Sequence, residues 1–61
     1  MPLYRFYLCG SDGHILRARD GECEATASKA MAFSLLLAEP SDIVTVEVWN
    51  KDTRVARIHR T

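Results

Sequence analysis

The sequence predicts one small α+β domain, spanning residues 1–61, in which a four-stranded sheet carries a single helix on one face. The chain has 61 residues, enough for one domain and too few for two. Two pairs of aromatic or β-branched segments enclose turn residues, which is typical of hairpins. An apolar segment without glycine or proline lies between the two pairs and favours a helix. The expected order is therefore ββαββ, with two layers.

The first hairpin is predicted from strands over residues 3–9 and 15–19, with the turn residues Ser11-Asp12-Gly13 between them. A three-residue loop places its glycine in the left-handed conformation, which glycine adopts without steric cost. This loop sets Leu8 opposite Leu16. The alternative, a two-residue Asp-Gly turn, sets Leu8 opposite an arginine and mixes buried with solvated side chains, so we expect the longer loop.

A helix is predicted over residues 27–38, where Pro40 ends it. Acidic residues precede its start and suit the positive end of the helix dipole. Phe33 and Leu36 are predicted to point to solvent. Two large apolar side chains on a solvated face are not expected of a monomer. At 3.6 residues per turn, the face predicted to pack on the sheet consists of Ala27, Ala30, Met31, Ser34, Leu37 and Ala38.

The second hairpin is predicted from strands over residues 43–49 and 55–59 around Asn50-Lys51-Asp52. A three-residue loop sets Val46 opposite Ala56, so that apolar side chains share one face of the sheet. The last residue of this loop takes the left-handed conformation, which aspartate tolerates better than most residues.

Because a lone hairpin is marginal in water, both hairpins are predicted to share one sheet. The preferred strand order is 2-1-4-3, as in β-grasp folds, with the first and last strands parallel in the centre. The alternative joins the hairpins through the first and third strands, which then run antiparallel. The predicted core consists of Tyr4, Phe6, Leu8, Leu16, Ala18, Ala30, Met31, Leu37, Val44, Val46, Val48, Ala56 and Ile58.

The sheet face turned away from the helix is predicted to be basic and aromatic, with four arginines and the single acid Glu47. Aromatic rings and arginines on an open sheet suit single-stranded nucleic acid. The same residue types are also enriched in protein interfaces. The candidate interaction face consists of Arg5, Tyr7, Arg17, Arg19, Trp49, Arg57 and His59.

The sequence contains no catalytic or metal-binding pattern. His14 and His59 are isolated, and Cys-x-x-Cys, zinc-ligand spacing and a phosphate-binding glycine loop are all missing. A chain of 61 residues also leaves little room for a deep ligand pocket. We therefore expect no enzyme activity, no cofactor and no metal.

Composition and charge exclude several other classes of protein. Eight Lys and Arg balance eight Asp and Glu, and 48% of the residues are hydrophobic, which excludes intrinsic disorder. Apolar runs reach only four residues, and no secretory signal is recognisable at the start. We therefore expect a cytoplasmic protein with no membrane partner, in which Cys9 and Cys23 are free thiols, buried or half-buried.

Four segments resemble a family of short proteins of unknown function found mostly in alphaproteobacteria. These segments are Met1-Pro2-Leu3-Tyr4-Arg5-Phe6-Tyr7, Asp12-Gly13-His14-Ile15, Glu22-Cys23 before the alanine-rich helix, and Val46-Glu47-Val48-Trp49. The resemblance covers most of the chain and implies a cytoplasmic bacterial protein with a ββαββ layout. It implies no activity and no binding residues. Cys9 and Gly10 stand where members of the family often carry acidic residues.

We predict a non-enzymatic protein-interaction module that forms a homodimer, because so small a core gains stability from association. Phe33 and Leu36 are the predicted oligomer contact, and an unidentified protein is a further partner. The alternative function is binding of single-stranded nucleic acid through the basic, aromatic sheet face.

Overall fold

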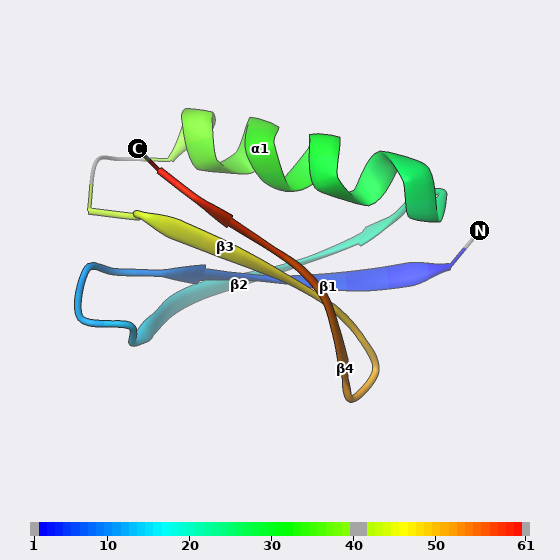
Figure 1. Cartoon of the computed structure of the whole chain (residues 1–61), viewed down its shortest axis with the longest axis horizontal. Coiled ribbons are helices and arrows are strands. Elements are labelled where there is room, and N and C mark those ends of the chain that lie inside the picture. Colours follow the sequence, from blue (N-terminus) through cyan, green and yellow to red (C-terminus); the bar gives the residue numbers. More distant parts are fainter. Residues whose placement is uncertain (1, 40–41, 61) are drawn as a thin grey trace.

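One helix lies across one face of a four-stranded sheet in the computed structural model, which describes residues 2–39 and 42–60 (Figure 1). This confirms the predicted α+β class. The predicted helix stop at Pro40 lies outside the described residues. The elements are β1 (Leu3–Cys9), β2 (Ile15–Glu22), the short 3₁₀ helix η1 (Ala25–Ala27), α1 (Ser28–Ala38), β3 (Thr45–Asn50) and β4 (Thr53–His59).

The strand order is β2-β1-β3-β4, and all neighbouring strands run antiparallel. The preferred order, with β1 beside β4, is therefore wrong, and the alternative order is the one adopted. Val44 precedes β3 and donates its backbone N–H to the Cys9 carbonyl oxygen, 2.9 Å away. The chain leaving α1 thus enters the sheet directly beside β1, and β4 folds back along the outer side of β3.

The loop of the first hairpin is the predicted one. Gly13 has φ 85°, and the Gly10 N–H donates to the His14 carbonyl oxygen at 3.0 Å, which closes a loop of three residues. The His14 backbone N–H also donates to Asp12 Oδ1 at 3.1 Å. This hydrogen bond, with that from the His14 ring, lowers the pKa of Asp12.

Beyond the loop, the predicted register of the first hairpin is wrong. Leu8 pairs with Arg17 rather than Leu16, and Phe6 pairs with Arg19. Leu16 is the extra residue of a β-bulge, which leaves it without a partner of its own. Because side chains alternate between the faces of a strand, one extra residue turns over every later side chain of β2.

The second hairpin turns through two residues rather than the predicted three. Lys51 takes the left-handed conformation with φ 58°. Val46 therefore pairs with Ile58 and not with Ala56. This shift is of two residues, so it leaves each of these side chains on its predicted face. Val55 is the extra residue of a second β-bulge, so that Trp49 pairs with Arg54 next to the turn.

The core lies between α1 and the sheet, and it comprises Tyr4, Phe6, Leu8, Cys23, Ala32, Leu36, Ile43, Val46 and Val48. Four predicted core residues are instead exposed, namely Leu16, Ala18, Ala30 and Leu37. Val44 is half-buried. Met31, Ala56 and Ile58 are partly buried and pack against the core. Both cysteines are free and buried, as predicted.

The face that α1 turns to the sheet also differs from the prediction. The buried positions are Ser28, Ala32 and Leu36, spaced four residues apart. Leu36 is only 2% exposed, so its predicted orientation toward solvent is wrong. Apolar residues occur on all sides of this helix, and periodicity alone therefore cannot select the buried face. The small side chains of Ser28 and Ala32 allow α1 to approach the sheet closely.

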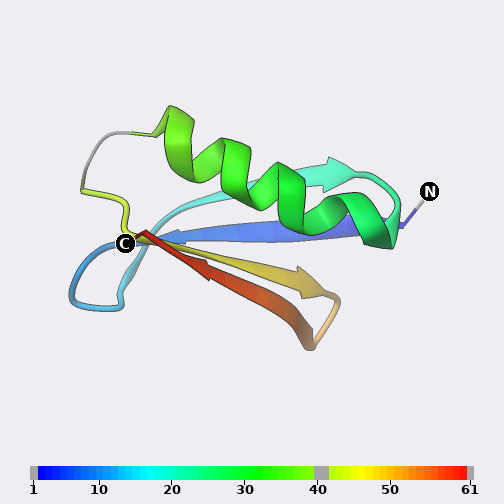
Figure 2. The ribbon, with the colours of Figure 1, turned by 45° about the horizontal axis from the view of Figure 1, so that its top comes forward.

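Arginines attach the C-terminal end of α1 to the sheet. Arg60 donates from Nη2 to the Leu36 carbonyl oxygen at 2.6 Å and from Nε to the Ile43 carbonyl oxygen at 3.2 Å. Arg17 and Arg19 of β2 contact the carboxylate of Glu39 directly after the helix. These contacts set the direction of α1, which crosses the strands obliquely (Figure 2). Within the described residues, no helix has the length and apolarity needed to cross a lipid bilayer.

Candidate interaction surfaces

The sheet face opposite α1, called the open face below, carries three rows of directly paired side chains. Paired residues of neighbouring strands have Cβ atoms about 5 Å apart, so the side chains of a row stand beside one another. From β2 to β4 the rows are Asp20-Arg5-Trp49-Arg54, Ala18-Tyr7-Glu47-Arg57 and Ile15-Cys9-Thr45-His59.

Two acidic side chains neutralise part of the open face. Arg5 Nε donates to Asp20 Oδ1 at 2.8 Å, and this hydrogen bond raises the pKa of Arg5. Glu47 accepts a hydrogen bond from Trp49 Nε1 at 3.0 Å, and its second oxygen lies 3.8 Å from Arg54 Nη1. Glu47 therefore stands beside the aromatic side chains, where it opposes binding of a phosphate.

An edge-to-face aromatic pair forms the floor of a shallow hollow on the open face. The ring centroids of Tyr7 and Trp49 lie 6.2 Å apart, with 77° between their planes. Both hairpin loops bend away from α1 (Figure 1), and Ile15 at the start of β2 and Lys51 of the second loop help to line the hollow. Its volume is about 320 Å³. The hollow is open to solvent, so it suits side chains of a partner better than a small molecule that must be enclosed.

The third row contains a thiol and a histidine but no activated nucleophile. Cys9 is 4% exposed, and burial raises the pKa of its thiol. His59 Nδ1 lies 2.7 Å from Thr45 Oγ1, so the imidazole is hydrogen-bonded to this hydroxyl. A neutral buried thiol is a poor nucleophile. Residues 2–39 and 42–60 contain no cluster of three or more His, Cys, Asp or Glu side chains that could bind a metal ion.

Five of the seven predicted interaction residues share the open face: Arg5, Tyr7, Trp49, Arg57 and His59. Arg17 and Arg19 do not, because the bulge at Leu16 turns them to the helix side. There they bind Glu39, with nitrogen to oxygen distances of 3.1 and 3.4 Å. The open face thus has fewer cations than predicted and one additional acid, Asp20. Its remaining positive charge lies mainly along β4.

A second candidate surface is the outward face of α1, defined here by Ala30, Phe33, Ser34 and Leu37. Phe33 is 53% exposed and Leu37 is 63% exposed. Ala30 and Ser34 are exposed beside them. Sequence reasoning identified Phe33 but placed Ala30, Ser34 and Leu37 toward the sheet. The signal available in the sequence was that large apolar residues occur on both sides of the helix.

No protein family model, curated protein or solved structure matches this chain. The resemblance to the alphaproteobacterial family therefore stays a prediction. Function rests on the geometry of the two surfaces.

Proposed function

We propose that this protein is a cytoplasmic, non-enzymatic interaction module in which two copies pair through the outward face of α1. The observation that carries the proposal is that α1 is apolar on both sides. Leu36 is buried in the core, while Phe33 and Leu37 are more than half exposed on the other side. A helix that is apolar all round normally has both sides covered. A second copy of the chain is the occupant that we propose.

The residues of the outward face are complementary to themselves in an antiparallel arrangement. When two copies of α1 are related by a two-fold axis at Phe33 and Ser34, each Leu37 lies against Ala30 of the other copy. Large side chains then fill the space above small ones, which is how packed helices approach closely. The helix dipoles also run in opposite directions in this pair. A two-fold contact of this kind is the commonest form of self-association.

The size of this surface predicts a weak dimer. Eleven helical residues extend about 16 Å, which provides less than the roughly 800 Å² per partner of a standard stable interface. We expect a dissociation constant between about 1 µM and 1 mM.

The absence of enzymatic activity is part of the proposal because the described surfaces present no activated nucleophile and no enclosed pocket. The thiol of Cys9 is buried and neutral, and the hollow above Tyr7 and Trp49 is open to solvent. The cytoplasmic location is proposed because both cysteines are free, as is usual in a reducing compartment.

Sedimentation equilibrium tests the self-association. We expect the mass to rise from 6.9 kDa toward twice that value as the protein concentration increases from about 10 µM to about 1 mM. The double variant Phe33→Ser/Leu37→Ser should stay monomeric, because it replaces both large side chains of the outward face. Leu3→Thr is the matched control, since Leu3 is 58% exposed on the sheet, and it should associate as the wild type does. A wild type that stays at 6.9 kDa at 1 mM would contradict the proposal.

A further inference from the structure

We infer that the outer edge of β4 binds an acidic, extended segment of a partner protein as a fifth strand of the sheet. β4 is an edge strand that pairs only with β3. Most of its residues are exposed. This surface belongs to the sheet layer and is separate from the outward face of α1, so it does not depend on the proposed homodimer.

The backbone of β4 has two residues positioned to pair with an added strand. The Arg60 N–H donates to the Val44 carbonyl oxygen at 2.7 Å, which is the bond that flanks a non-hydrogen-bonded pair of Thr45 with His59. In an antiparallel ladder such pairs, whose N–H and C=O groups point outward, alternate with hydrogen-bonded pairs. Arg57 and His59 therefore direct their backbone groups away from β3. A strand laid along this edge would satisfy them, as in β-augmentation.

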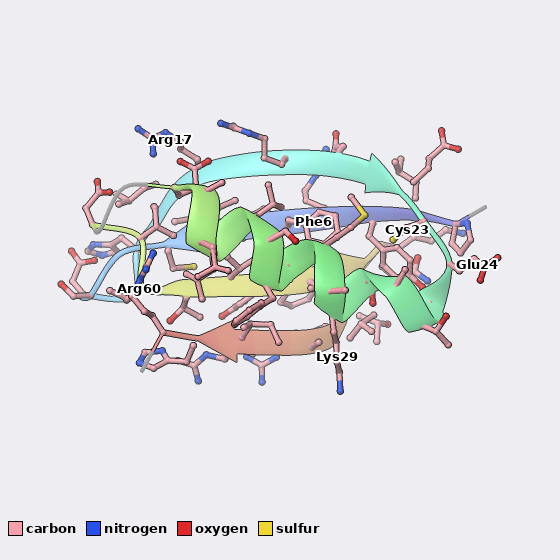
Figure 3. The ribbon with its side chains drawn as sticks, turned by 90° about the horizontal axis from the view of Figure 1, so that it is seen from above. Phe6, Arg17, Cys23, Glu24, Lys29 and Arg60 are labelled. Carbon is pink, nitrogen blue, oxygen red and sulfur yellow. The ribbon has the colours of Figure 1, made fainter. Side chains whose placement is uncertain are left out.

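The side chains around this edge are cationic on both sides of the sheet. Arg57 and His59 lie on the open face, and Arg57 forms no ion pair with any described residue. On the other side, Lys29 extends from α1 beyond β4 (Figure 3). Glu47 forms an ion pair with Arg54 and stands opposite Arg57 in the register, so one carboxylate offsets part of the charge of two arginines. Acidic side chains are the complement of this edge.

The opposite edge of the sheet lacks this charge imbalance. In β2, Arg17 and Arg19 contact Glu39, and Asp20 pairs with Arg5. Both edges expose backbone groups, so the unneutralised positive charge is what distinguishes β4 from β2.

The apolar side chains of β4 define the rest of the ligand. Ala56 and Ile58 point to the helix side and are half-buried against the core. Because side chains of a strand alternate, a partner strand should carry acidic residues on the open side and apolar residues on the helix side. A nucleic acid offers no N–H and C=O ladder to pair with the edge, so a polypeptide fits these observations better.

The test is an amide-resolved NMR titration of the whole chain with a capped octapeptide of alternating glutamate and valine. We expect shifts centred on Arg57 and His59, together with slowed hydrogen exchange of these two amides. A peptide with the same composition but with its glutamates and valines in separate blocks should bind less tightly. Arg57→Gln should weaken binding about fivefold. Arg19→Gln, the matched change at the other edge, should leave binding unchanged.

Several outcomes would overturn the inference. These are no shifts on β4 at millimolar peptide, shifts centred on β2, or equal binding of the block peptide. If a mixed oligonucleotide pool bound at the same amides more tightly than the peptide, the cationic side chains of β4 would be a nucleic-acid site instead. The variant Leu37→Ser should bind the alternating peptide as the wild type does, so failure of the homodimer and failure of this inference give different results.

Discussion

Single side chains determine which surfaces of this protein remain available for chemistry or contact. Cys9 lies on the open face at the end of β1, yet it is only 4% exposed. Arg60 donates one hydrogen bond to the Leu36 carbonyl oxygen of α1 and another to the Ile43 carbonyl oxygen just before β3. The first residue restrains reactivity, and the second fixes the helix to the sheet.

The raised pKa of Cys9 predicts how stability changes with alkaline pH. The ordinary thiol value is 9.0, and burial raises the pKa in the folded state. The unfolded chain therefore loses its thiol proton first, so this stabilisation is fully present below pH 9.0 and is lost as the pH rises through the folded pKa. Urea unfolding at pH 7 and pH 10 should show a smaller loss for Cys9→Ser than for the wild type. Identical losses would show that Cys9 does not contribute.

Removing the Arg60 side chain should destabilise the fold. Arg60→Ala leaves the carbonyl oxygens of Leu36 and Ile43 without these charged donors, and hydrogen bonds to charged groups are worth about 1.5–3 kcal/mol. Arg57→Ala is the control, since Arg57 is exposed and should change the free energy of unfolding by less than about 0.5 kcal/mol. Urea denaturation measures both variants. Equal stability of the two would refute the anchoring role of Arg60.

At the scale of elements, the sequence predicts which strands and helices form better than it predicts the register between neighbouring strands. The alternating residues around Ser11-Asp12-Gly13 predict both the strands and the loop of the first hairpin. They do not reveal the bulge at Leu16. That single extra residue moves Arg17 and Arg19 to the other face, and with them a large part of the predicted basic surface.

The helix shows the same limit in another form. Its existence follows from an apolar segment without glycine or proline, and its bounds differ from the predicted ones by one residue. Its rotation depends instead on tertiary contacts, namely Glu39 with the β2 arginines and Leu36 with Arg60. The outward face could be predicted as apolar, but only Phe33 was assigned to it correctly.

Two neighbouring leucines of α1 test the rotation of the helix. Leu36→Ala should cost about 2–5 kcal/mol of unfolding free energy, because it leaves a cavity in the core. Leu37→Ala, measured where the chain is monomeric, should cost less than about 0.5 kcal/mol because Leu37 is 63% exposed. Urea unfolding followed by circular dichroism gives both values. A larger loss for Leu37→Ala would mean that the helix packs through the face predicted from the sequence.

At the scale of the whole molecule, the two proposed contacts occupy different layers. The helix layer presents an apolar face for a second copy, and the sheet layer presents a cationic edge for an acidic strand. A core of this size gives little net stability on its own, so association through the helix layer adds to it.

The most direct test of the central claim is disulfide crosslinking of Ser34→Cys under mild oxidation. In the antiparallel pair, position 34 of each copy lies at the two-fold axis, so we expect a covalent dimer at about 100 µM protein, within the range predicted for association. Ser11→Cys, in the exposed loop of the first hairpin, is the control and should crosslink much more slowly. Crosslinking of Ser34→Cys that is no faster than that of Ser11→Cys would contradict pairing through the outward face of α1.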